Sequence, residues 1–294
     1  MSEQWRERIA IDPQIHHGEP CVKGTRVPVR VIVGSVADGD TAEQILDAWP
    51  QLTGDDIKAA LKFAAEGARL LLAARRAGKL AEVASRALER GAEAVHSIDL
   101  DVRSRHAVQR AIDELPAEWA EIDVLVNNAG LSRGMEKLYT GRIDDWEEMI
   151  DTNIKGLLYV ARAVVPGMVV RGRGHVVNLG SMAGELVYPN GAVYCGTKAA
   201  ARTINDGLRE DLLGTPVRVT SVDPGMVETD FSLVRFRGDA GRAAKVYKGV
   251  KPLTAEDVAD VILWAVTRPE HVNIARVSLS SADQANTLLI HRKE

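Results

Sequence analysis

The chain has 294 residues, of which 46% are hydrophobic and 27% are charged, a balance typical of a soluble protein with one large domain and one small one. A net charge of −4 without a basic cluster argues against nucleic-acid binding. Two widely separated cysteines, Cys21 and Cys195, offer neither a disulfide framework nor a metal cluster, so no metal is expected. The first residues lack the apolar segment of a secretory signal, and no apolar run approaches the roughly 20 residues of a membrane helix. We therefore expect a cytoplasmic protein that does not enter a membrane.

Residues 1–66 have turn-rich and helical patterns of their own. Glycine and proline are dense between residues 17 and 28, which indicates turns. Residues 29–36 fit two structures, because their valines alternate as in a strand while Pro28 and the spacing of the apolar residues suit a helix. Thr41 and Gln44 have the spacing of a capping box, which predicts a helix that ends before Pro50. Thr53 is expected to begin another helix.

The same stretch resembles a small bacterial antitoxin-like domain family of unknown function. The resemblance rests on the residues Ile9-Ala10-Ile11-Asp12-Pro13 and His17-Gly18-Glu19-Pro20-Cys21-Val22-Lys23-Gly24-Thr25-Arg26-Val27-Pro28. It implies a small, mostly helical domain over residues 1–66, fused to the rest of the chain. The link of that family to toxin partners implies a binding module with a possible protein partner.

From residue 67 onward, short apolar strands alternate with amphipathic helices. This alternation predicts an α/β domain over residues 67–294, with a parallel sheet and helices on both faces. The strands are expected at residues 69–74, 92–98, 122–126, 175–179, 217–222 and 272–279. The helices are expected at residues 79–90, 105–115, 146–170, 192–213 and 255–267.

A tyrosine and a lysine four residues apart begin the helix predicted at residues 192–213. This spacing places Tyr194 and Lys198 on one helical face, where the ammonium favours the ionised form of the phenol. Such a phenol can act as a general acid or base toward an alcohol or carbonyl oxygen, and Ser181 can orient that oxygen. The three residues together predict proton transfer at an alcohol, although a tyrosine–lysine pair alone also occurs on surface helices.

Five motifs in order resemble the short-chain dehydrogenase/reductase family. They are Asn127-Asn128-Ala129-Gly130, Asn153, Ser181, the pair Tyr194 and Lys198, and Pro224-Gly225. The resemblance implies a Rossmann-like doubly wound parallel sheet, a small-molecule substrate and a homo-oligomer. It implies that Ser181, Tyr194, Lys198 and Asn153 are catalytic, with Asn153 holding a water behind the lysine.

The resemblance also implies a nicotinamide cofactor. Arg75 and Arg76 directly follow a strand and form a cationic pair suited to a 2′-phosphate, which predicts NADP. Asp101 and Val102 stand where the family contacts adenine, although Asp101 would also suit a helix cap. The remaining expected cofactor-binding residues are Asn127, Asn128, Ala129, Gly130, Tyr194, Lys198, Pro224, Gly225, Val227 and Thr229.

Within the family, the chain is most similar to NADP-dependent 3-hydroxy acid dehydrogenases. The similarity rests on residues 224–239 and on His271-Val272-Asn273-Ile274. It implies an oxidoreductase that transfers a hydride between NADP and a small hydroxy acid or a related alcohol or carbonyl compound. Arg235 and Arg237 are either contacts for a substrate carboxylate or exposed arginines on a mobile lid.

One departure from the family is large. Its first strand and its Thr-Gly-x-x-x-Gly-x-Gly phosphate loop are missing, and the antitoxin-like segment stands in their place. Since the first strand is central in this fold, we expect a gap in the sheet and an impaired cofactor site. Residues 29–34 could fill that gap if they form a strand. The alternative function is a catalytically inactive binding module whose N-terminal domain recognises a protein.

Overall fold

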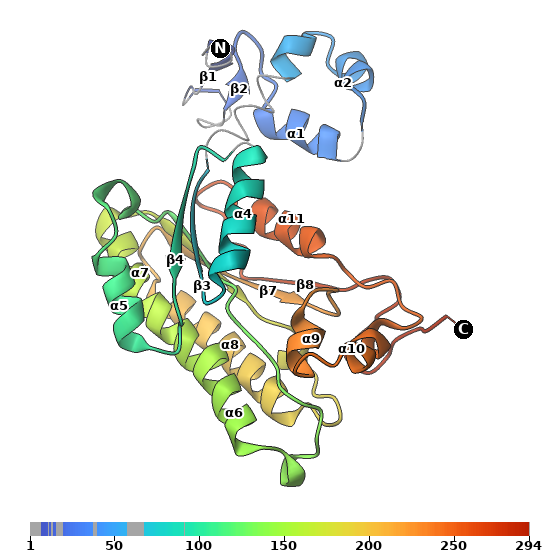
Figure 1. Cartoon of the computed structure of the whole chain (residues 1–294). Coiled ribbons are helices and arrows are strands. Elements are labelled where there is room, and N and C mark those ends of the chain that lie inside the picture. The colour runs from blue at the N-terminus through green and yellow to red at the C-terminus, as the bar shows by residue number, and fades with distance from the viewer. Residues whose placement is uncertain are drawn as a thin grey trace. The chain divides into compact units, whose positions relative to one another are not determined.

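The computed structural model describes residues 7–10, 12, 14–15, 20–37, 40–57, 68–90 and 92–293 (Figure 1). The chain divides into two compact units, Met1–Asp99 and Leu100–Glu294. The first unit contains the antitoxin-like segment together with a short parallel strand pair. The second contains a four-stranded parallel sheet and the tyrosine and lysine identified above.

The antitoxin-like segment has a small core of its own. Strands β1 (Ile9–Ala10) and β2 (Cys21–Val22) pair antiparallel, and helices α1 (Val29–Ala37) and α2 (Ala42–Ala48) follow. The structure resolves the ambiguity at residues 29–36 in favour of a helix, because Ile32 is completely buried in this core and Val36 packs against it one turn later. These residues therefore do not supply the missing strand.

Hydrogen bonds at two helix starts confirm the predicted caps. The Thr41 side chain accepts from the Gln44 backbone, and the Gln44 side chain accepts from the Thr41 backbone, which completes the capping box. At the next helix start, the Asp56 carboxylate accepts from the backbone and hydroxyl of Thr53 and from Arg8. Burial alone would raise the pKa of Asp56, but these hydrogen bonds lower it below its ordinary value. The predicted continuation of this helix lies outside the described residues.

The first unit also contains a parallel βαβ hairpin. Strands β3 (Arg69–Ala74) and β4 (Ala94–Asp99) pair in parallel along their whole length. Helix α4 (Ala77–Glu89) connects them and buries Leu80. Every end of these strands and of the helix lies within two residues of the predicted end.

The sheet of the second unit has the order β5-β6-β7-β8, and every pairing in it is parallel. Its strands are β5 (Val124–Asn127), β6 (Gly174–Leu179), β7 (Val217–Pro224) and β8 (Arg276–Leu279). Its α-helices are α5 (Arg105–Asp113), α6 (Ile143–Ile150), α7 (Leu157–Arg171), α8 (Ala192–Asp211), α9 (Phe231–Arg235), α10 (Ala240–Tyr247) and α11 (Ala255–Val266). A π-helical turn, Asp151–Gly156, joins α6 to α7, and the segments Ala117–Trp119, Leu138–Thr140 and Met182–Gly184 are 3₁₀-helical.

Helices cover both faces of this sheet, as the sequence pattern predicts. Val176 on β6 and Val219 on β7 are buried in a cluster with Met168 of α7. The alternate strand residues, such as Val177, are buried on the other face in a cluster with Val258 of α11. Since successive side chains of a strand point to opposite faces, this alternation establishes a doubly wound α/β arrangement (Figure 1).

One continuous helical segment, Ile143–Arg171, is long and apolar enough to cross a membrane by length and composition. The sequence predicts a helix at residues 146–170, but not that this helix is apolar enough for such a span. The segment consists of α6, the π-turn and α7, and its apolar residues Val164, Val165 and Met168 are buried in the core against β6 and β7. Buried core helices of soluble domains pass the same test, so the finding is weak support for a membrane span.

The parallel strands form two separate ladders. Within the described residues, β3 pairs with β4, and β5 has a single ladder partner, β6. On β5, Leu125 packs into the core, while Val124 is 44% exposed and Val126 is 39% exposed. The expected gap in the sheet therefore stays a prediction, because β4 and β5 belong to different units.

Candidate active site

The sheet gathers the predicted motifs at one edge. Asn127 is the last residue of β5, Leu179 of β6 and Pro224 of β7, so the segments that carry the motifs all leave the sheet at the carboxyl ends of its strands. In open α/β sheets this edge forms the ligand crevice. Among the described residues, no group of three or more His, Cys, Asp or Glu residues is arranged to hold a metal ion.

Tyr194 and Lys198 occupy the first two turns of α8, and both are buried. The Nζ atom of Lys198 donates to the carbonyl oxygen of Leu179 at 2.7 Å, which fixes the ammonium at the end of β6. Burial lowers the pKa of Lys198 to about 8, and the nearby Asp223 carboxylate opposes that shift. The lysine therefore loses its proton at a much lower pH than a lysine in water.

The Tyr194 phenol has a raised pKa of about 12. Burial is the main cause and the proximity of Tyr188 adds to it, while Arg235 and the nearby Ser181 hydroxyl act in the opposite direction. The raised pKa is opposite in direction to the ionised phenol expected from the tyrosine–lysine spacing, because burial outweighs the nearby cations. The ammonium is bonded to a backbone carbonyl, and the cation that acts on the phenol is Arg235.

Ser181 lies two residues after the end of β6 and caps the short helix Met182–Gly184. Its Oγ accepts from the backbone of Ala183 at 3.1 Å and donates to the carbonyl of Pro224 at 3.4 Å. The hydroxyl is half-buried and lies near enough to the Tyr194 phenol to lower the pKa of that phenol. The structure thus brings Ser181 and Tyr194 together as predicted from their spacing.

Asn153 lies in the π-turn between α6 and α7. Its Oδ1 accepts from the backbone N–H of Leu131 at 2.8 Å, and its Nδ2 donates to the Leu131 carbonyl at 2.8 Å and to Thr197 Oγ1 at 2.9 Å. π-turns inside α-helices are frequent at functional sites. The amide thereby ties the loop after β5 to α8, and it is itself 3% exposed.

The Asn127-Asn128-Ala129-Gly130 motif divides into a buried start and an exposed end. Asn127 is buried and donates from Nδ2 to Asn178 Oδ1 on β6 at 2.9 Å. Asn128, Ala129 and Gly130 are exposed. A Cβ atom at Gly130 would lie 3.4 Å from Asn153 Oδ1 and 3.5 Å from Lys198 Nζ, so this glycine borders the amide and the ammonium directly.

A buried chain of amides continues from Asn127 across the sheet. Asn178 donates to Asn205 Oδ1 on α8 at 3.0 Å, and Asn205 donates to Asp206 at 3.4 Å. Arg276 on β8 then pairs with Asp206 at 2.9 Å. Sequence reasoning missed Asn178, Asn205 and Thr197. The one signal for them is that each is a polar residue within a predicted strand or helix. Their effect is to hold β5, β6 and α8 in fixed relation.

The segment after β7 turns toward α9. A Cβ atom at Gly225 would lie 2.3 Å from Gln284 Oε1 and would displace that side chain, whose oxygen accepts from the backbone of Met226. The carbonyl of Val227 accepts from Tyr247 at 2.8 Å. Thr229 is exposed, and its hydroxyl caps the backbone of Phe231 at 3.2 Å.

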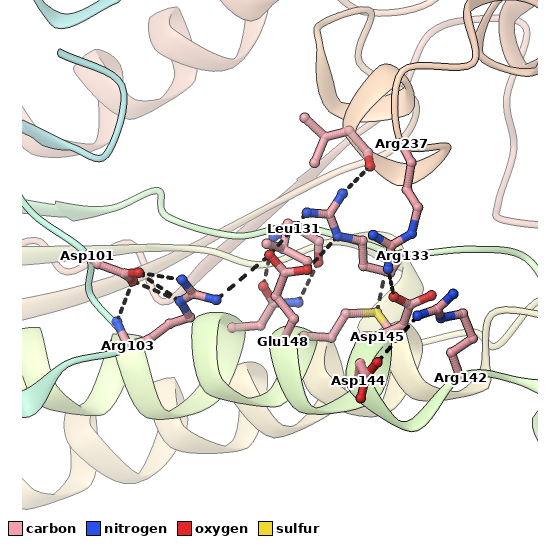
Figure 2. Close-up of polar contacts among 12 residues, drawn as sticks. Asp101, Arg103, Leu131, Arg133, Arg142, Asp144, Asp145, Glu148 and Arg237 are labelled. Carbon is pink, nitrogen blue, oxygen red and sulfur yellow. Dashed lines mark hydrogen bonds and ion pairs between the residues drawn. The ribbon is translucent and has the colours of Figure 1, made fainter.

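The residues predicted to contact adenine and the 2′-phosphate are divided between the two units. Arg75 and Arg76 directly follow β3 in the first unit and are exposed. In the second unit, the Asp101 carboxylate accepts from the Arg103 guanidinium, and Val102 lies against Gly156 at the start of α7. Figure 2 shows the Asp101–Arg103 pair next to Glu148.

A hollow adjoins Tyr194. Its lining comes from the loop after β5, the start of α6 and the start of α8, and it includes Arg133, Asp145 and Trp146. Arg133 pairs with Glu148 at 2.6 Å, and Asp145 pairs with Arg237 (Figure 2). The hollow is therefore lined by the Tyr194 phenol and by two charged side chains, Arg133 and Asp145, that already form ion pairs.

Comparison with known proteins identifies both parts of the chain. Residues 56–238 match the short chain dehydrogenase family, and residues 9–64 match a family described as a protein of unknown function (DUF433). An NADP-dependent 3-hydroxy acid dehydrogenase of Shigella flexneri is 46% identical over 234 residues, which cover 79% of this chain and 93% of that protein. Its counterpart in Schizosaccharomyces pombe is 42% identical over 77% of this chain and 87% of that one.

Solved structures give the same result. A closed form of serine dehydrogenase complexed with NADP+ is 44% identical, with a TM-score of 0.72, and the match covers 79% of this chain and 94% of that one. Serine dehydrogenase from Escherichia coli is 41% identical, with a TM-score of 0.64 over 76% of this chain and 91% of that one. The chain belongs to the short-chain dehydrogenase/reductase family, with a DUF433 segment at its N-terminal end.

Proposed function

We propose that this protein is an NADP-dependent oxidoreductase that interconverts a small hydroxy acid and the corresponding carbonyl compound. The observation that carries the proposal is the convergence of Tyr194, Ser181, Lys198 and Asn153 at the carboxyl edge of the sheet. Dehydrogenase chemistry needs a proton donor or acceptor at the reacting oxygen and a cofactor for the hydride. The identity to 3-hydroxy acid dehydrogenases supports the substrate class.

The residues present fit a nicotinamide cofactor at the edge of β5 and β6. Gly130 leaves open backbone beside the Lys198 ammonium, where a side chain would narrow the approach of a flat ring. We assign Lys198, Tyr194 and the Asn128–Gly130 backbone to the nicotinamide-ribose end, and residues 224–229 to the carboxamide. Asp101 and Val102 would contact adenine, and Arg75 and Arg76 the 2′-phosphate. When bound, NADP accepts or supplies the hydride.

The chain's own residues would handle the proton. Since the pKa of Tyr194 is about 12, the phenol is protonated at neutral pH, and this form suits donation to a carbonyl oxygen. Ser181, which lies near the phenol, would orient that oxygen. Lys198 lies behind the tyrosine on the same helix, and Asn153 fixes the loop beside it. A water next to Asn153 and Lys198 would return the proton from solvent.

Tyr194→Phe tests the proposal most directly. We expect loss of NADPH-dependent reduction of a short 3-oxo acid or semialdehyde by at least about a hundredfold, because general acid catalysis contributes on that order. The fold and NADPH affinity should change little, since the ring remains. Tyr139→Phe is the matched control, because Tyr139 is 80% exposed. Comparable turnover in Tyr194→Phe and Tyr139→Phe, with both folded, would refute the assignment.

We also propose that the antitoxin-like domain ends near residue 66. Support comes from the two family matches, which overlap only at residues 56–64, and from the helix that begins after Thr53. The overlap suggests that the two parts are fused within these residues. A fragment spanning residues 1–66 that gives a cooperative thermal transition would support this boundary, and an unfolded fragment would contradict it.

A further inference from the structure

Arg235, the last residue of α9, lies among aromatic rings beside the candidate proton donor. Its guanidinium carbon is 5.3 Å from the ring centre of Tyr194 and 5.0 Å from that of Phe231. It is 5.9 Å from the ring centre of Tyr188, whose hydroxyl accepts from Nη2 at 2.9 Å. The arginine therefore presents a positive charge at the catalytic tyrosine.

This charge is not neutralised in the described part of the chain. Arg235 is half-buried, its Nε atom is buried without an acceptor, and no described carboxylate forms an ion pair with it. Two arginines nearby differ in this respect. Arg133 pairs with Glu148, and Arg237 pairs with the buried Asp145 (Figure 2). Because desolvating an unpaired charge is costly, Arg235 is suited to an anion that arrives with a ligand.

Backbone contacts hold Arg235 in place. The N–H of Gly134 donates to the carbonyl of Arg235 at 3.0 Å, and the Arg133 guanidinium donates to the carbonyl of Val234. These two bonds attach the end of α9 to the loop after β5, next to the hollow that Tyr194 lines. The position of the guanidinium is thus set by the scaffold of the site and differs from that of a freely moving surface arginine.

We propose that Arg235 binds the carboxylate of the substrate while Tyr194 engages its hydroxyl or carbonyl oxygen. This inference rests on the proposed function and names the residue that would make the enzyme selective for acids. In a 3-hydroxy acid a single methylene separates the carboxylate carbon from the carbon that bears the hydroxyl. The guanidinium carbon of Arg235 is 5.3 Å from the centre of the Tyr194 ring, a short distance that matches this separation in the substrate. Arginine also presents donors that fit a carboxylate.

The test compares 3-hydroxybutyrate with methyl 3-hydroxybutyrate, which has the same chain without the charge. Both are oxidised with NADP+ by the full-length protein and by Arg235→Gln. We expect Arg235→Gln to raise KM for the acid by about ten- to a hundredfold, as loss of a charged hydrogen bond implies, and to leave KM for the ester within about twofold. Arg235→Lys should recover part of the loss, because it keeps the charge but not the planar fork.

The control variant is Arg242→Gln. Arg242 is exposed on α10 and stacks on Phe236 at 4.3 Å, so it reports the general effect of removing a cation from this region. Kinetics of Arg242→Gln should equal those of the unmodified protein. An equal loss for acid and ester in Arg235→Gln, or no loss for either, would overturn the proposal.

A binding measurement separates this inference from the proposed function. Calorimetry with malonate on Tyr194→Phe needs no turnover. If the unmodified protein oxidises neither compound, the proposed function fails, and malonate binding that Arg235→Gln abolishes would still support the carboxylate site. Absence of malonate binding, or binding that Arg235→Gln leaves unchanged, would overturn it.

Discussion

Replacing Asn153 by alanine should destabilise the second unit, whatever the cofactor site does. The Asn153 side chain accepts from the N–H of Leu131 and donates to the Leu131 carbonyl. Leu131 is only 3% exposed, so water has little access to either backbone group. Thr197 keeps its own bond to the Tyr194 carbonyl at 2.8 Å, so it loses less. Two buried backbone groups left without partners cost about 1–3 kcal/mol each, and a water in the vacated space recovers part of that.

We therefore expect Asn153→Ala to lower the free energy of unfolding by about 2–4 kcal/mol. The measurement is a urea titration of the full chain followed by far-ultraviolet circular dichroism and by tryptophan fluorescence, since two probes reveal whether the units unfold separately. Asn128→Ala is the control, because Asn128 is exposed and should change the unfolding free energy by no more than about 0.5 kcal/mol.

Asn153→Asp sharpens the argument. A carboxylate can still accept from the N–H of Leu131 but cannot donate to the carbonyl oxygen, so two acceptors face each other. This variant should be at least as unstable as Asn153→Ala at neutral pH and should regain stability as the carboxyl is protonated in mild acid. A loss below about 0.5 kcal/mol in Asn153→Ala would refute the structural role assigned to the amide.

Three further predictions concern charge. The folded pKa of Lys198 is lowered from 10.5 to about 8, so the unfolded chain binds more protons in that window, and the unfolding free energy should rise between pH 8 and 10.5. Lys198→Met should abolish this rise in pH-dependent urea titrations, and a rise that persists in the variant would disprove it. Arg75→Ala combined with Arg76→Ala should erase a preference for NADPH over NADH, and equal use of both by the unmodified chain would contradict the assignment. Calorimetry should show NADPH binding at least about tenfold weaker than in a chain whose residues 1–58 are replaced by a strand and Gly-rich loop, and equal affinities would show that the present site is intact.

Strands and helices of the second unit could be predicted from the sequence, because their apolar residues repeat with the spacing of the buried face. The positions of β6 and α8 follow from apolar spacing, and they place Ser181 and Tyr194 at the same edge. Residues 29–36 were ambiguous because a run of valines suits strand and helix alike. The helix is stabilised by packing of Ile32 against residues of other segments. Such contacts cannot be read from the local sequence pattern.

The electrostatics of the site were the least predictable part. The spacing of Tyr194 and Lys198 correctly places them on one helix but does not reveal that the ammonium bonds to Leu179. Nor does it reveal that Arg235, 41 positions after Tyr194, lies over its ring. Burial, the main cause of the raised pKa of Tyr194, depends on residues distant in the chain. The roles of Arg75, Arg76, Asp101 and Val102 remain predictions.

The chain of amides from Asn127 to Asp206 has a direction. An ionised carboxylate only accepts hydrogen bonds, so Asp206 requires Asn205 to donate, and Asn205 then turns its oxygen toward Asn178. Asn178 in turn accepts from Asn127, and the carbonyl oxygen of Asn127 is the acceptor left at the end of β5. Arg276 also donates to the Asp206 carboxylate, at 2.9 Å. The acceptor at Asp206 thus sets the direction of every hydrogen bond in the chain, including the donation from Asn127 to Asn178.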